Sequence, residues 1–175
     1  LLNAPGFVRL DGAMGTMLQR KGLPVGMAPE LAGLEHPDWL LEIHRAYLAA
    51  GAQVATANTF GASALKLAGT GCTPETVIAA NVSLARQAVG DRALVALDIG
   101  PLGQLLEPTG TLRFDDAYDC FAQMVRAGAK AGADLVLLET MTDLYEVKAA
   151  LLAVKENSSL PVICTMTIED NRRTF

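Results

Sequence analysis

Glu139 is the residue whose type and position best suit chemistry on a ligand. It follows four aliphatic residues at 135–138, a run that predicts a strand buried on both faces, as in parallel sheets. The carboxyl ends of parallel strands face the ligand in α/β proteins. A carboxylate partly shielded from water there attracts a cation more strongly than an exposed one. Glu139 is therefore a candidate partner for a cationic group, and the alternative is a cap or a surface acid.

A similar phrase occurs earlier in the chain. Residues 50–59 read AGAQVATANT, and residues 131–140 read AGADLVLLET. The strand expected at 54–57 would deliver Asn58 and Thr59 to the same sheet edge as Glu139. Both could donate neutral hydrogen bonds to a ligand, or they could satisfy backbone groups of their own loop.

A third candidate is the turn that follows a short strand expected at 7–10. Its two glycines would let backbone N–H groups approach a ligand closely. The turn consists of Asp11, Gly12, Ala13, Met14, Gly15 and Thr16.

Strands and helices that alternate along the chain must position these groups. The patterns predict strands at 7–10, 54–57, 93–97, 135–138 and 161–167, and helices at 38–50, 73–89, from about 115, and from 143. The region from 21 to 35 reads as a loose loop, 61–68 as a short helix, and 98–103 as a turn. Asp143 and Glu146 suggest a capping box, with Leu144, Val147, Leu151 and Val154 facing inward.

Strict alternation of this kind implies parallel strands joined by right-handed helical crossovers. A doubly wound sheet would show a GxGxxG fingerprint in its first turn, and residues 11–16 lack that spacing. Polar residues at several strand ends, including Thr167, instead favour a TIM-type (β/α)8 barrel. Such barrels take about 250 residues. We therefore expect one incomplete barrel domain over 1–175, truncated to about the first five βα units, with edge strands prone to self-association.

Composition excludes several classes of function. A net charge of −5 with scattered basic residues gives nucleic acid no basic face to bind. No apolar run reaches the length of about 18 residues needed to span a membrane, and we expect no leader because the sequence shows no basic-then-apolar pattern of that kind. The expectation is a cytoplasmic protein with no membrane or nucleic-acid partner. Cys72, Cys120 and Cys164 are too widely spaced for a CxxC metal clip and are expected to be buried thiols.

Several motifs, in this order, resemble the homocysteine S-methyltransferase family, and most closely the homocysteine-binding modules of cobalamin-dependent methionine synthases. They cover the chain nearly end to end. The motifs are DGAMGTML at 11–18, HRAYL at 44–48, AGA at 50–52, TANTFGA at 56–62, GPLG at 100–103 and LETMTD at 138–143. The Pro29-Glu30 loop has Ala-Gly where the family usually has Leu-Asn, so the sequence assigns that loop no role.

The resemblance implies a (β/α)8 barrel that transfers a methyl group to the sulfur of homocysteine, giving methionine. It also implies that residues 11–16 meet the amino-acid end of homocysteine, that Glu139 pairs with its ammonium group, and that Asn58 and Thr59 lie nearby. No catalytic residue is assigned.

The family's zinc makes the substrate thiol reactive, because a free thiol of pKa about 8.5 is mostly protonated at neutral pH. That zinc is held by three cysteines in motifs that this chain does not contain, so no metal ligand is assigned and the chain alone is expected to be inactive. Methylcobalamin, delivered by folate- and cobalamin-binding modules of an intact enzyme, is the implied methyl donor, although the sequence leaves the donor open.

Two alternatives remain at this point. One is a non-catalytic module, or pseudo-enzyme, that keeps the first units of the fold and binds an amino acid or nothing. The other is an unrelated barrel enzyme, such as a pterin-binding synthase.

Overall fold

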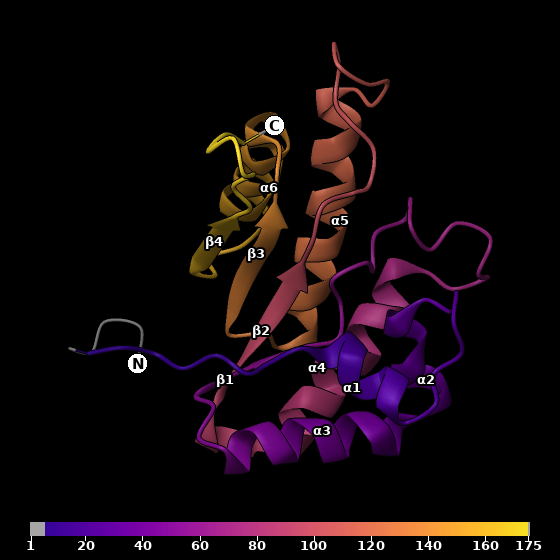
Figure 1. The fold of residues 1–175 in the computed structure, drawn as a ribbon, viewed down its shortest axis with the longest axis vertical. Helices are drawn as coiled ribbons and strands as arrows, with labels where there is room; N and C mark the ends of the chain where they lie inside the picture. Colours follow the sequence, from indigo (N-terminus) through magenta and orange to yellow (C-terminus); the bar gives the residue numbers. More distant parts are fainter. Residues whose placement is uncertain (1–5, 175) are drawn as a thin grey trace.

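In the computed structural model, which describes residues 6–174, the strands form one parallel sheet in chain order (Figure 1). Its members are β1 (Val54–Thr56), β2 (Leu94–Ile99), β3 (Leu135–Met141) and β4 (Val162–Met166). A doubly wound sheet reverses its strand order at a switch point, whereas barrel strands follow one another without reversal. The order β1-β2-β3-β4 therefore confirms the barrel-type α/β fold.

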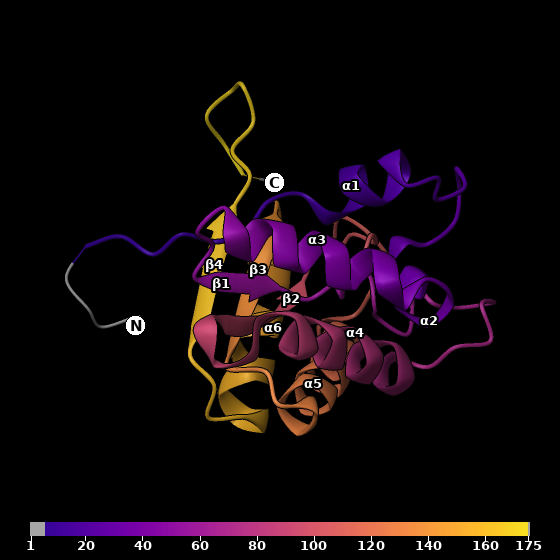
Figure 2. The ribbon, with the colours of Figure 1, turned by 90° about the horizontal axis from the view of Figure 1, so that it is seen from below.

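The helices α4, α5 and α6 connect successive strands, and α3 precedes β1. These helices pack beside one another in chain order, α3 against α4, α4 against α5 and α5 against α6 (Figure 2). Their bounds follow from local signals: Thr73 and Asp143 cap the helices after them through their side chains, and Gly132 ends α5 with a φ of +88°. The helices are α1 (Met14–Arg20), α2 (Ala32–Glu35), α3 (Pro37–Ala49), α4 (Pro74–Val89), α5 (Phe114–Ala131) and α6 (Leu144–Asn157), with 3-10 turns η1 (Pro29–Leu31) and η2 (Gly90–Arg92).

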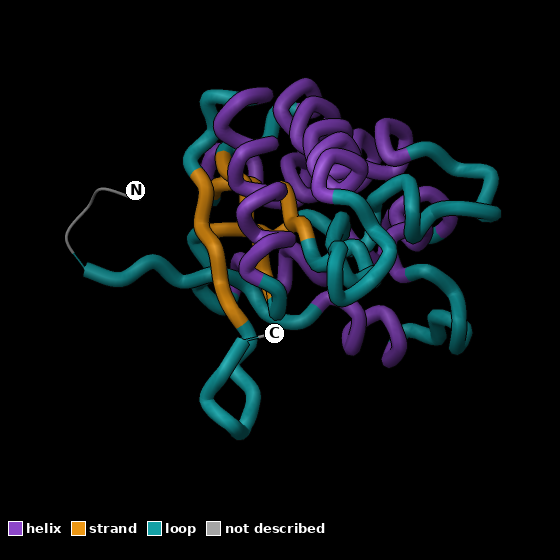
Figure 3. Tube along the Cα trace, turned by 90° about the horizontal axis from the view of Figure 1, so that it is seen from above, coloured by secondary structure: helices purple, strands orange, loops and turns teal. Residues whose placement is uncertain are grey.

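The two faces of the sheet have different surroundings. One face packs under the helices in the main core, where Leu97, Phe121 and Val136 are fully buried. Figure 3 shows most of the helices gathered on that side of the strands. The other face carries a much smaller cluster that includes Ala96 and Leu137. In a closed barrel this second face would point to the axis, and its carboxyl end is where polar groups are expected.

The segment 7–10 is not a regular strand. Leu10 makes only an isolated parallel bridge to Val54, and the Arg9 carbonyl accepts from both Gln53 and Val54, at 2.8 and 3.2 Å. The Arg9 N–H turns to the Gln53 side chain instead. Because two successive N–H groups donate to the one Arg9 carbonyl, the hydrogen bonds do not continue as a regular β-ladder. The segment still borders β1.

Other boundaries also differ from the sequence prediction. Residues 14–20 form α1 where a turn and loop were expected, and η1 and α2 occupy the end of the expected loop. Residues 61–68 form turns rather than a helix. The strands β2 and β3 run further than predicted, so that Asp98 and Glu139 lie within strands.

The start of α6 corrects a further prediction. Asp143 caps the helix by accepting from the Tyr145 N–H, but Glu146 is buried and accepts the Leu102 N–H at 2.7 Å. The two therefore do not form a reciprocal capping box, because Glu146 is used in a long-range contact. Leu144 and Leu151, expected to face inward, are exposed.

The cysteines are not all buried. Cys72 and Cys120 are half-buried, and Cys164 is exposed on β4. Thr165 beside it is also exposed, and no strand of residues 6–174 pairs with the outer side of β4. Self-association through this strand stays a prediction. Over the same residues, no helix has the length and apolar character needed to cross a membrane.

Candidate functional site

Strand register brings polar side chains together at the carboxyl end of the sheet. Thr56 pairs with Ala96 on β2, and Asp98 pairs with Leu137 on β3. Because side chains two residues apart share a face, Asp98 lies on the same face as Thr56, and Glu139 on the same face as Leu137. The three polar residues therefore project from three successive strands, on the face turned away from the helices.

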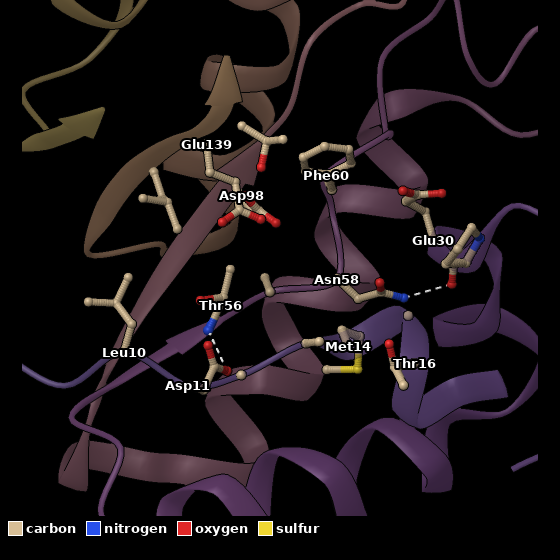
Figure 4. Close-up of a pocket in the computed structure, with 17 residues that line it drawn as sticks. Leu10, Asp11, Met14, Thr16, Glu30, Thr56, Asn58, Phe60, Asp98 and Glu139 are labelled. Carbon is tan, nitrogen blue, oxygen red and sulfur yellow. Dashed lines mark hydrogen bonds between the residues drawn. The ribbon is translucent and has the colours of Figure 1, made fainter. Parts of the chain in front are cut away.

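These side chains line a cavity of about 510 Å³. The N-terminal segment around Asp11 and the turn η1 complete its wall (Figure 4). Four carboxyl side chains face it, from Asp11, Glu30, Asp98 and Glu139, and no Lys, Arg or His is among the described residues that line it. A lining of this kind favours a ligand with a cationic group, since a positive charge offsets the mutual repulsion of the carboxylates.

The structure brings together all the candidate residues except one. Residues 11–16, Asn58 and Glu139 all line the cavity. Thr59 does not: it is fully buried, its hydroxyl donates to the Asp98 carbonyl at 2.8 Å, and its hydroxyl oxygen accepts the Asp98 N–H at 3.0 Å. Thr59 therefore fixes the end of β2 rather than facing a ligand.

Asn58 has a structural contact as well as a place in the wall. Its side-chain amide donates to the Pro29 carbonyl at 2.7 Å, as Figure 4 shows. This bond ties the segment that follows β1 to η1, and it uses the side-chain amide that the sequence suggested as a donor to a ligand.

Two lining acids were missed from the sequence. Asp98 follows the apolar run 93–97 as Glu139 follows its own run, which is a usable signal, but the Gly100-Pro101 pair makes the segment look like a turn. Glu30 belonged to a loop without periodicity. Only the structure places these two side chains beside Glu139 and Asp11.

Glu30 is held in place on two sides. Its carboxylate accepts the Gly61 N–H at 2.7 Å, and its backbone carbonyl accepts the Asn81 side-chain amide at 2.9 Å. A Cβ on residue 61 would lie 2.6 Å from the Glu30 carboxylate oxygen. Glycine at this position therefore leaves room for the close approach of the Glu30 carboxylate.

The Asp11 side chain is almost completely buried and accepts the Thr56 N–H at 2.9 Å. Burial raises the pKa of Asp11 to about 6, against the opposing effect of the Thr56 hydrogen bonds, and the charge of Glu139 adds to the increase. His44 lies behind it, with Nδ1 3.9 Å from the carboxylate. Burial lowers the pKa of His44 to about 4. At neutral pH the histidine is therefore uncharged, and the short distance does not make an ion pair.

A bulge in β3 lies directly beside Glu139. The pairing of β3 with β4 shifts between Leu138 and Met141, and Thr140 adopts a φ of +59°, a conformation that β-branched residues rarely take. The Thr140 N–H donates to the Thr165 hydroxyl at 3.2 Å. Bulges commonly re-aim side chains beside binding sites, and here the bulge follows the half-buried Glu139 directly.

Comparisons with known proteins agree with the geometry. The family model "Homocysteine S-methyltransferase" matches residues 8–175. Methionine synthases of Mycobacterium leprae and Mycobacterium tuberculosis are 31% and 30% identical, each over 91% of this chain and 15% of the relative. The homocysteine methyltransferase MmuM from Escherichia coli superimposes in its metallated form with a TM-score of 0.87, at 24% identity, over 99% of this chain and 67% of that chain.

The oxidized form of MmuM gives the same TM-score of 0.87 at 25% identity, over 66% of its chain. The chain thus spans about two thirds of MmuM and a small part of the curated methionine synthases. The family match extends over nearly the whole sequence and includes every residue that lines the cavity. The chain belongs to the homocysteine S-methyltransferase family.

Proposed function

We propose that this chain forms the homocysteine-binding part of a homocysteine S-methyltransferase, which makes methionine. The observation that carries the proposal is the cavity at the carboxyl end of the sheet, where Glu139 and three further acids face the ligand space and none of the lining residues within 6–174 is basic. Residues 1–175 would then be part of a homocysteine-binding barrel domain. Folate- and cobalamin-binding modules are its proposed partners, with methylcobalamin as the methyl donor, as the resemblance to cobalamin-dependent methionine synthases implies.

Two parts of the cavity wall have a proposed role in binding homocysteine. The carboxylate of Glu139 accepts hydrogen bonds from the ammonium group of homocysteine, and the backbone of residues 11–16 meets its amino-acid end. A Cβ at Gly12 would lie 2.9 Å from the Tyr47 ring, so glycine lets the segment pack closely against that ring. The Tyr47 hydroxyl donates to the Ala13 carbonyl at 3.0 Å. The tyrosine thus holds the segment close to α3, and the segment keeps a fixed position in the wall.

The zinc that the resemblance implies is not matched by the residues described. Within 6–174, no group of three or more His, Cys, Asp or Glu side chains is arranged to hold a metal ion. Cys72 precedes α4, Cys120 is in α5 and Cys164 is in β4. We therefore propose that thiol activation does not use these three cysteines, and we assign this chain only the binding and orientation of the amino acid.

Calorimetric titration with L-homocysteine tests the proposal. The control ligand is 4-mercaptobutanoic acid, which is homocysteine without its amino group. We expect homocysteine to bind at least about tenfold more tightly, because only homocysteine can pair a cation with Glu139. Equal affinities for the two thiols, or no binding of homocysteine, would contradict the proposed function.

A further inference from the structure

Asp98 and Glu139 bring two carboxyl groups to one face of adjacent strands. The register that pairs Asp98 with Leu137 makes Asp98 and Glu139 diagonal neighbours. In Figure 4 the two side chains lie in the same part of the cavity. Asp98 is only 5% exposed, and its Oδ1 atom has no hydrogen-bond partner among the described residues. Because the two carboxyl groups share a face and Asp98 has an unpartnered oxygen, the question is which of the two carries the negative charge.

The charged groups around Asp98 do not compensate a negative charge on it. Those that share the cavity are Asp11 from the N-terminal segment, Glu30 from η1 and Glu139 from β3. Of the bases nearby, His44 lies behind Asp11, and Lys66 stands over the Phe60 ring at 5.0 Å from its centroid. A buried carboxyl group is costly to ionise when acids surround it and, as here, the described part of the lining holds no cation.

When two neighbouring carboxyl groups share one proton, the more buried group holds it, because burial disfavours charge. Asp98 is enclosed by β1 and β3 and anchored at both backbone groups by Thr59, whereas Glu139 is half-exposed and keeps contact with solvent. Because solvent stabilises charge, Glu139 is the member of the two that carries the negative charge. In agreement, burial raises the pKa of Asp98 well above its usual range, and the charge and hydrogen bonding of Glu139 add to the increase.

We propose that Asp98 and Glu139 form a carboxyl pair that holds one proton on Asp98, which donates a hydrogen bond to the Glu139 carboxylate and so positions it for the ligand. The pair then carries a single negative charge. One charge matches one ammonium group, and the Asp98 hydrogen bond limits the orientations of Glu139. The part of this proposal that concerns the ligand rests on the proposed function, whereas the proton on Asp98 does not.

Infrared spectroscopy of the ligand-free chain at neutral pH tests the proton directly. A protonated carboxylic acid has a carbonyl band that a carboxylate lacks. We expect this band to weaken in Asp98→Asn and to persist in Asp134→Asn. Asp134 is a matched control because it accepts the Val95 N–H at 2.7 Å and is ion-paired with Arg86 at the other end of the sheet. An identical band in wild type and Asp98→Asn would overturn the proposal.

Homocysteine affinity tests the positioning role. Asp98→Asn keeps a donor of the same shape, so we expect affinity within about threefold of wild type. Asp98→Ala removes the donor to a charged group, and we expect a loss of roughly tenfold or more. Thermal unfolding of both variants checks that the fold is kept. If Asp98→Asn weakens binding as much as Asp98→Ala does, then Asp98 acts through its charge and the positioning role is wrong.

The two measurements separate this proposal from the proposed function. A chain that binds no homocysteine but loses the infrared band in Asp98→Asn would overturn the function and support the proton on Asp98. A chain that binds homocysteine but keeps the band in Asp98→Asn would support the function and overturn the pair.

Discussion

Replacing Glu139 with glutamine is expected to weaken the binding of L-homocysteine by about tenfold to a hundredfold. The substitution keeps the size of the side chain but removes the charge that the ammonium group would meet in the cavity, whose described lining residues include no base. A hydrogen bond to a charged group contributes about 1.5–3 kcal/mol, which corresponds to this range of affinity. Calorimetric titration of the variant and of wild type measures the change.

The matched control is Glu35→Gln, which removes a carboxylate that is exposed and does not line the cavity. Its affinity for homocysteine should equal that of wild type. If Glu139→Gln also binds like wild type, while both variants unfold at the wild-type temperature, Glu139 does not receive the ammonium group.

Replacing Phe121 with alanine is expected to lower the free energy of unfolding by about 3–5 kcal/mol. Phe121 is fully buried on α5 and belongs to the core that packs the helices on the sheet. Truncation would leave a cavity that the neighbouring side chains fill only in part. Denaturant-induced unfolding of the two proteins, analysed by linear extrapolation, gives the difference.

Phe7 offers the same side chain in an exposed position, at 79% exposure. Phe7→Ala should change the free energy of unfolding by no more than about 0.5 kcal/mol. A loss below about 1 kcal/mol for Phe121→Ala would mean that α5 does not pack on the sheet as described.

Much of the fold could be predicted because each element carries its own signal. The aliphatic run at 135–138 and the helix start at Thr73-Pro74 are local patterns, and both elements appear where they were expected. The prediction of a turn at 11–16 was wrong from Met14 onward, where α1 begins. The two glycines of this segment are typical of a turn. Here packing outweighs weak local propensity, since Leu18 of α1 is fully buried.

The candidate site was predicted less completely, because it depends on register. Asp98 and Glu139 are far apart in sequence, and only the pairing of β2 with β3 puts them on one face. The pair Asn58-Thr59 shows a similar limit. Neighbouring residues turn their side chains in different directions, so Asn58 lines the cavity and Thr59 is buried against Asp98. No local pattern distinguishes these two outcomes.

A crystal structure of the chain with L-homocysteine would show directly where the amino acid binds. We expect the ligand in the cavity at the carboxyl end of the sheet, with its ammonium nitrogen within hydrogen-bond distance of the Glu139 carboxylate and its amino-acid end against residues 11–16. Homocysteine bound outside this cavity, or bound inside it with the ammonium group turned away from Glu139, would contradict the proposed function.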